Sequence, residues 1–281
     1  MSLLTDHQLA ELSDDSLIDH IAWIVRGDSR SSYRLVEYKN HGMKAAVWRV
    51  TDDVGSNFAL KIVPPDIESG WNLVDEMTEA RKLNPNYFAQ VWSFGNLEIR
   101  DGTKSRTLTC DYKAVATDWV DGKPFAEYTK SNPLIGEEFL LLVEQLFTAL
   151  AVLRNNGLCH DDLHPGNVLI QPKTNPLTNE PTIAIKVIDT GSVKRIDTRH
   201  RLLTDLRNKI ALLEKENAPD ERIEEYRALL AWKEPDDHLR AVECLLYAAN
   251  SLAGNYHRLQ FWERVFFDRL LALVSSIQSS S

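Results

Sequence analysis

The hydrophobic pattern of the chain changes character near residue 120, and this change limits the folds that are open to it. Between residues 33 and 63, three short runs (RLVEY, AAVWRV and NFALKIV) are separated by the turn compositions NHG and DDVGSN. Short runs rich in β-branched and aromatic residues between such turns are typical of strands. They predict an antiparallel meander in the first part of the chain.

After the turn residues DGKP, at 121–124, the apolar residues follow a helical spacing. Residues 137–157 place one apolar stripe on a helix and end at Gly157, a residue suited to the left-handed conformation that follows many helices. The stripe consists of Phe139, Leu142, Val143, Leu146, Leu150 and Leu153. We therefore predict a two-lobed α+β protein, with an antiparallel sheet and one helix in residues 1–120 and a mainly helical lobe in residues 121–281.

Other helices and strands are predicted around this division. Residues 6–26 carry apolar side chains at helical spacing and predict an amphipathic helix that stops at Gly27. WNLVDEMTEARKL predicts the helix of the first lobe, and residues 199–234 predict a helical hairpin inserted into the second. The tail from His238 is also predicted to be helical. Further strands are predicted over residues 88–95, 108–120, 167–170 and 183–189.

The composition disfavours several classes of protein. A formal net charge of −9 argues against a nucleic-acid-binding surface. The three cysteines, Cys110, Cys159 and Cys244, form no C-x-x-C pair, so neither a disulfide framework nor a zinc ribbon is indicated. No apolar run reaches the ~18 residues of a membrane span, and no signal-peptide pattern is visible. We expect a soluble, cytoplasmic protein that binds neither nucleic acid nor membrane.

The stretch CHDDLHPGNVLI, residues 159–170, gathers groups able to bind a metal or move a proton directly before an apolar run. Asp162 and Asn167 are five positions apart, which is the spacing of the catalytic Asp and the metal-binding Asn in H-R-D-L-x-x-x-N. On these residues the chain resembles the protein-kinase-like superfamily. The resemblance implies that Asp162 is the base that orients the acceptor hydroxyl and that Asn167 is a Mg²⁺ ligand.

A second segment, KVIDTGS at 186–192, is similar to the strand and D-F-G turn of that superfamily. Thr190 replaces the Phe of the triplet. The similarity implies that Asp189 is the main Mg²⁺ carboxylate, and that ATP and Mg²⁺ are the cofactors.

Upstream, NFALKIV resembles the A-x-K strand, which implies that Lys61 contacts the first phosphates of the nucleotide. Its expected partner is a Glu on the following helix, where Glu76 and Glu79 lie one turn apart. Glu76 is favoured because it leaves room for two further turns before Pro85.

The phosphate-covering loop keeps only part of the family's pattern. When Val47 is aligned with the Val of G-x-G-x-x-G-x-V, Asn40, Gly42 and Ala45 occupy the three glycine positions. Asn tolerates positive φ and Ala is small, so backbone amides could still approach phosphates. Gly42 and Val47 are therefore expected to bind the nucleotide.

The segment VATDWVDG resembles the hinge between the lobes of a kinase. This resemblance makes Asp118 and Val120 expected cofactor-binding positions, with Val120 contacting adenine through its backbone. Asp237 resembles the residue that starts a helix and holds the catalytic loop.

Several positions depart from the protein-kinase pattern. Asp161 replaces the Arg of the H-R-D motif and no A-P-E triplet follows Asp189, so switching by phosphorylation of an activation loop is not expected. His164 replaces the usual Lys, which is similar to the aminoglycoside and choline kinase branch and to many atypical bacterial kinases. The acceptor therefore stays open between a protein and a small molecule.

The favoured function is transfer of the ATP γ-phosphate to a hydroxyl by a Ser/Thr protein kinase of atypical bacterial type. A small-molecule kinase is the alternative, and a pseudokinase scaffold is a further one because the glycine loop is eroded. A hydrolytic metal centre of His160, Asp162 and His164 is the competing chemistry, and it leaves Pro165, Gly166 and Asn167 without a role. The helices of 199–234 are a candidate surface for a protein partner or for self-association.

Overall fold

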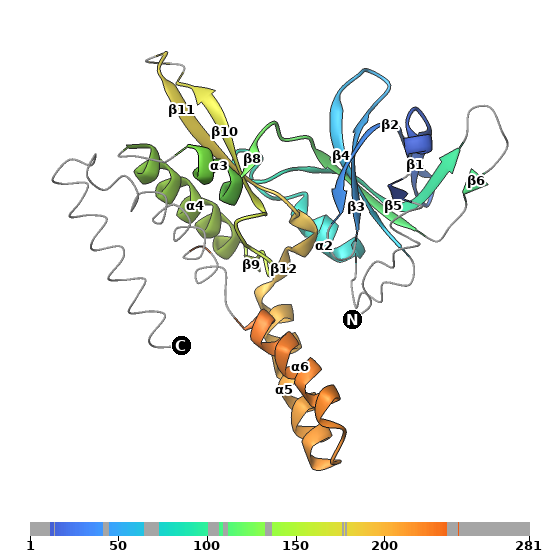
Figure 1. Cartoon of the computed structure of the whole chain (residues 1–281), viewed down its shortest axis with the longest axis vertical. Coiled ribbons are helices and arrows are strands. Elements are labelled where there is room, and N and C mark those ends of the chain that lie inside the picture. Colours follow the sequence, from blue (N-terminus) through green and yellow to red (C-terminus); the bar gives the residue numbers. More distant parts are fainter. Residues whose placement is uncertain are drawn as a thin grey trace. The chain divides into compact units, whose positions relative to one another are not determined.

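The computed structural model describes residues 12–13, 15–41, 45–64, 73–100, 107–108, 112–132, 137–175, 177, 179–234 and 241. The chain divides into two compact units, which we describe separately (Figure 1). Unit 1 comprises Met1–Lys82 and Ala89–Val120, and unit 2 comprises Leu83–Phe88 and Asp121–Ser281. The segment Leu83–Phe88 belongs to unit 2, although it lies within residues 1–120, because Phe88 pairs with Val187 there.

Six antiparallel strands of unit 1 close into a ring. In ring order they are β1 (Ile21–Arg26), β2 (Ser29–His41), β3 (Ala46–Thr51), β4 (Asn57–Val63), β7 (Lys113–Asp118) and β5 (Val91–Arg100). Each strand pairs with the next, and β5 pairs back with β1. The short β6 (Thr107–Leu108) adds to the end of β5. The strands predicted from the sequence are present, but the closure through β1 was not predicted.

Side chains at alternate positions fill the interior of this ring. On β3, Ala46, Trp48 and Val50 are fully buried in one cluster with residues of β1, β2, β4, β5 and β7. The indole N–H of Trp48 donates to the carbonyl of Leu12 at 2.8 Å. Leu12 and Leu17, the last residue of the 3₁₀ helix η1 (Asp15–Leu17), belong to the same cluster. The segment before β1 is therefore part of the core, as a small ring of strands has room only for side chains inside.

The prediction of a helix over residues 6–26 is wrong for its last part. Residues 21–26 form β1, which turns into β2 through the two residues Gly27 and Asp28, since Arg26 lies opposite Ser29. Gly27 has φ of +56°, the left-handed conformation that two-residue hairpin turns require. The β-branched residues of IAWIVR and the turn dipeptide after it indicate a strand. The helical spacing of a few preceding leucines led to the wrong prediction. Residues 1–11 lie outside the described part of the chain.

The predicted helix of the first lobe is confirmed as α2 (Leu73–Ala80), on which Met77 and Ala80 are fully buried. Arg81 follows it directly. Its guanidinium donates to the carbonyl oxygens of Val91 and Trp92 and lies 5.2 Å from the ring centroid of Phe94. The end of α2 is therefore fixed to β5.

Unit 2 contains a long helix packed on a two-stranded hairpin. Its elements are β8 (Lys123–Pro124), α3 (Phe125–Ser131), α4 (Glu137–Asn155), β9 (Leu158–Cys159), β10 (Val168–Thr174), β11 (Pro181–Val187), η2 (Thr190–Ser192) and β12 (Lys194–Arg195). The predicted helix is α4, and Gly157 follows it with φ of +69°. Gln145 of α4 binds the backbone of Ile183 and Ile185 on β11 at 3.1 and 2.9 Å. The strands predicted over residues 167–170 and 183–189 are present as β10 and β11, which pair as an antiparallel hairpin.

The two helices predicted within 199–234 are present as α5 (Ile196–Lys215) and α6 (Asp220–Lys233). They run antiparallel and form a narrow arm (Figure 1), with Ile210, Leu213 and Ile223 buried between them. Asn217 lies in the connection with φ of +51°. Of the predicted helical tail, only Ala241 is among the described residues. In the described part of the chain, no helix combines the length and the apolar character needed to cross a membrane.

Candidate active site

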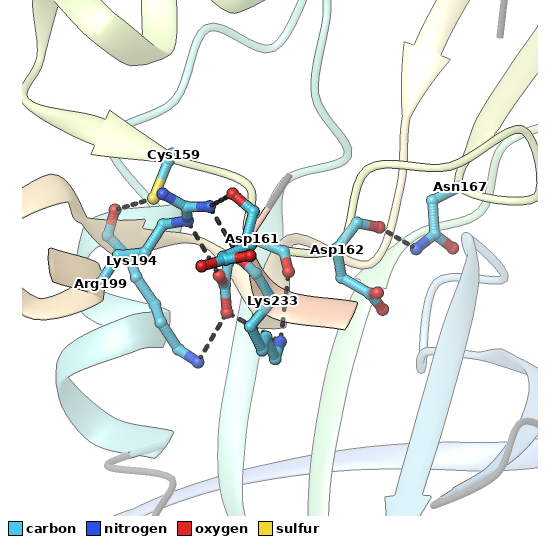
Figure 2. Close-up of polar contacts among 8 residues, drawn as sticks. Cys159, Asp161, Asp162, Asn167, Lys194, Arg199 and Lys233 are labelled. Carbon is cyan, nitrogen blue, oxygen red and sulfur yellow. Dashed lines mark hydrogen bonds and ion pairs between the residues drawn. The ribbon is translucent and has the colours of Figure 1, made fainter. Parts of the chain in front are cut away.

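The predicted catalytic loop joins β9 to β10 and is held by hydrogen bonds within itself. The side-chain Nδ2 of Asn167 donates to the carbonyl oxygen of Asp162 at 2.9 Å (Figure 2), and its backbone N–H donates to the carbonyl of His164 at 2.8 Å. Asn167 is 8% exposed. The amide nitrogen of Asn167 is bound to the loop, and the amide oxygen Oδ1 is the acceptor atom of this side chain.

A second set of hydrogen bonds joins this loop to the residues before Asp189. The N–H of Ile188 donates to the carbonyl of Asn167 at 2.8 Å, and Nε2 of the fully buried His160 donates to the carbonyl of Ile188 at 2.9 Å. Asp189 follows in the left-handed region, with φ of +56°. The structure thus places Asp162, Asn167 and Asp189 on one hydrogen-bonded framework.

His164 shapes the loop. Its Nδ1 accepts the backbone N–H of Gly166 at 3.0 Å, so the neutral ring carries its proton on Nε2. A Cβ at position 166 would lie 2.7 Å from the His164 ring, which explains the glycine there. With the imidazoles of His160 and His164 used in this way, the three groups of the rival hydrolytic centre do not converge. In the described residues, no group of three or more His, Cys, Asp or Glu is placed to hold a metal.

Asp161, which replaces the Arg of the motif, lies at the centre of an ion cluster that the sequence did not predict. Its side chain is 1% exposed and forms ion pairs with Lys233 at 2.9 Å, Lys194 at 3.1 Å and Arg199 at 3.4 Å. We call these four residues the Asp161 cluster (Figure 2). Lys194 lies on β12, Arg199 in the first turns of α5 and Lys233 at the end of α6. The cluster therefore ties the base of the helical arm to the predicted catalytic loop.

The charge state of Asp161 follows from its surroundings. Burial by itself raises the pKa of this carboxyl, but the charges of Lys233 and Lys194 and their hydrogen bonds outweigh it, so the pKa is lowered. Asp161 is therefore ionised at neutral pH. A buried carboxylate that is held by several cations is costly to remove, because the cations then remain buried without it.

We expect Asp161→Asn to destabilise the protein by about 3 kcal/mol at pH 7. Because the folded-state pKa is lowered, the stabilisation is fully present above the unfolded pKa of about 3.9 and is lost as pH falls through the folded value. The difference between variant and wild type should therefore shrink below about pH 4. Urea unfolding at several pH values measures this difference in the free energy of unfolding. The control is Asp205→Asn, at an exposed position on α5. An Asp161→Asn difference that does not change with pH would contradict the ion pairing.

In unit 1, Lys61 lies on the face of β4 that points away from the barrel interior. Its neighbours Leu60 and Ile62 are fully buried in the core, and Lys61 is opposite Val47 of β3 and Val115 of β7. The structure therefore brings the predicted residues Lys61 and Val47 together on one outer face of the sheet.

Asp118 has a role that the sequence did not indicate. Its carboxylate accepts the backbone N–H of Gln90 at 3.0 Å and the indole N–H of Trp92 at 2.7 Å. It fastens the end of β7 to the start of β5. Val120 is partly buried and is the last residue of unit 1.

Three predicted positions receive no structural test. Glu79 is paired with Lys82 at 3.0 Å, whereas the side chain of Glu76 on α2 lies outside the described part of the structure, so the choice between them stays a prediction. Gly42 and Asp237 also lie outside the described residues. The convergence of Lys61 from unit 1 with Asp189 from unit 2 remains a prediction as well.

The donor set of unit 2 fits Mg²⁺. Mg²⁺ prefers oxygen ligands and keeps several waters, so one carboxylate, one amide oxygen and the phosphates of a nucleotide suffice. Asp189 would supply the carboxylate, and Asn167, whose Nδ2 donates to the carbonyl of Asp162, would supply its Oδ1. These two residues would hold the ion.

Comparison with known proteins points in the same direction. The ABC1 atypical kinase-like domain family matches residues 103–218. The probable serine/threonine-protein kinase MRK1 homolog of Encephalitozoon cuniculi is 30% identical over 61% of this chain and 48% of its own length. The serine/threonine-protein kinase PknA of Mycobacterium tuberculosis is 26% identical over 59% of this chain and 36% of its own. The chain thus spans half or less of the length of these curated relatives.

Solved structures show partial likeness. The PknI kinase domain of Mycobacterium tuberculosis matches with a TM-score of 0.41 and 24% identity, over 57% of this chain and 60% of that one. Rad53, solved with AMP-PNP, matches with a TM-score of 0.44 and 21% identity, over 57% and 38%.

The sequence matches support a kinase-like protein. This chain is similar to serine/threonine-protein kinases, and its residues 103–218 match the ABC1 atypical kinase-like domain.

Proposed function

We propose that this protein is an ATP- and Mg²⁺-dependent phosphotransferase that moves the γ-phosphate to a hydroxyl of Ser or Thr in a protein. Asp162 is the base that orients the acceptor, Asn167 and Asp189 hold Mg²⁺, and Lys61 contacts the first phosphates. Glu76 pairs with Lys61, while Gly42, Val47 and Val120 line the nucleotide site. When bound, Mg²⁺ neutralises charge that develops on the transferred phosphate.

One observation carries this proposal. The hydrogen bonds from Asn167 to Asp162 and from Ile188 to Asn167 join Asp162, Asn167 and the residue before Asp189 in one framework. This supports the roles proposed for these three acidic and amide residues. Phosphoryl transfer depends on positioning and on charge stabilisation more than on covalent chemistry, so such a framework is what the reaction needs. The kinase relatives support the same reaction class.

A second candidate acceptor is a small molecule with a hydroxyl group. The observation that favours it is His164, whose Nδ1 is bound to Gly166 within the loop. Protein kinases usually place a Lys ammonium at this position, and an imidazole held inside the loop cannot replace its charge.

Incubation with Mg²⁺ and ATP radiolabelled in its γ-phosphate tests the proposal, with labelled protein and labelled small metabolites scored separately in a cell extract. Label on Ser or Thr is the expected result. Label on a metabolite would replace the protein acceptor by a small one. Nucleotide binding without any transfer would refute the reaction and leave a binding module.

We expect Lys61→Met to lower the transfer rate by on the order of 10² to 10³-fold, because a preorganised charge beside the phosphates is lost. The matched control is Lys39→Met, which removes a lysine paired with Glu37 on β2 of the same unit. Steady-state kinetics with varied ATP measure both variants. Equal activity of the two would remove Lys61 from the nucleotide site.

A further inference from the structure

Asp161 is held from several directions at once. Lys233 Nζ donates both to the Asp161 carboxylate at 2.9 Å and to the Asp161 backbone carbonyl at 3.2 Å (Figure 2). That carbonyl is part of the peptide bond between Asp161 and Asp162. Lys233 therefore fixes the orientation of the peptide plane on which the proposed base is carried.

The conformation of Asp161 requires this support. Its φ is +60°, in the left-handed region that is unfavourable for a non-glycine residue and persists only where surrounding contacts enforce it. Asp189 has φ of +56°. Both unusual backbone positions lie next to or at a residue of the proposed site.

The cluster also reaches the segment that follows Asp189. Lys194 pairs with Asp161 at 3.1 Å, and β12 pairs with β9, where Lys194 lies opposite Cys159. The Cys159 thiol points to the carbonyl of Lys194 at 3.6 Å. One carboxylate therefore connects the residues before Asp162 to the residues after Asp189.

The helical arm supplies the other two cations. Arg199 Nη2 donates to the carbonyl oxygens of Lys233 and Glu234 at 2.8 and 2.9 Å. These carbonyls lie at the C-terminal end of α6, where the helix dipole favours a cation. Arg199 is 8% exposed. The first turns of α5 and the last turn of α6 are thus bonded to each other, and together they bind Asp161.

We propose that Asp161 is a positioning residue for phosphoryl transfer, and that Lys194, Arg199 and the arm residue Lys233 hold it so that the peptide before Asp162 keeps its orientation. The inference deepens the proposed function and rests on it. All the charges of the Asp161 cluster are on unmodified side chains. The cluster can therefore hold the catalytic loop without phosphorylation of an activation loop.

The test compares Lys233→Met with Lys233→Arg, and with Arg227→Met as matched control. Arg227 is an exposed residue of the same helix that pairs with Glu214 and Glu224. We expect Lys233→Met to lower kcat by on the order of 10 to 10²-fold, since a small misplacement of a reacting group has effects of this size, while KM for ATP changes less than about twofold. Lys233→Arg should recover most of the loss, and Arg227→Met should change neither constant.

Lys194→Met provides a second variant from a different segment and should lower kcat in the same way. A kcat for both Met variants equal to that of Arg227→Met would overturn the proposal. A higher KM for ATP with unchanged kcat would also overturn it, because that result would assign the cluster to ATP binding.

Amide hydrogen exchange separates this inference from the proposed function. The N–H groups of Asn167 and Ile188 are bonded within the site framework, so they should exchange faster in Lys233→Met than in Arg227→Met. If the wild-type protein transfers no phosphate, the proposed function fails. The exchange rates then still decide whether the cluster holds the loop, and equal rates would overturn that as well.

Discussion

Replacing Asp189 by alanine is expected to lower the rate of ATP-dependent phosphoryl transfer by on the order of 10³-fold or more, because the proposed metal carboxylate and its charge stabilisation would be lost together. Asp162→Ala should cost on the order of 10² to 10⁴-fold, the usual contribution of a positioned base. Asp189→Ala should be at least as damaging as Asp162→Ala. Initial rates with the radiolabelled nucleotide measure both effects.

The concentration of Mg²⁺ distinguishes the two roles. A variant that lacks a metal ligand binds Mg²⁺ more weakly, so Asp189→Asn should raise the Mg²⁺ concentration needed for half-maximal rate. Asp162→Asn should leave that concentration unchanged, since the base does not bind the ion. The exposed Asp205→Asn serves as a control for loss of a carboxylate elsewhere in unit 2. Full labelling by both Asp162→Ala and Asp189→Ala would show that the site assignment is wrong.

Replacing Gly95 by alanine is expected to destabilise the protein by about 3 kcal/mol, at the upper end of what overpacking costs. A Cβ at position 95 would overlap the carbonyl oxygen of Val25 and lie 2.9 Å from its carbon. Both strands are fixed there, because β5 pairs with β1 on one side and with β7 on the other. The clash cannot be relieved without separating β1 from β5.

Urea unfolding of Gly95→Ala measures this effect, with Gly27→Ala as its control. Gly27 has open space around it but positive φ, so its substitution should cost only about 1 kcal/mol of backbone strain. Wild-type stability of Gly95→Ala would mean that β1 does not close the ring in solution.

The candidate site was predictable from the sequence wherever its chemistry resides in short motifs. Asp162 and Asn167 lie within one loop, and Asp189 follows the hairpin that this loop begins. Residues this close along the chain also lie close together in the fold. Lys61 and Val47 were placed on neighbouring strands for the same reason, and register pairs them directly. The closed ring was not predictable in this way, because IAWIVR also matches a helical spacing of apolar residues.

What the sequence by itself determined is the local structure and the order of the motifs, because strand runs, the α4 stripe and the loop residues depend on neighbours a few positions away. Only the tertiary structure decided the partners of Asp161 and the closure by β1. Lys194 and Lys233 lie 33 and 72 positions further along the chain from Asp161. Nothing in the local pattern around a lysine says which buried carboxylate it will meet, since that encounter depends on how the α5–α6 arm and the β9–β12 pair fold back upon the loop.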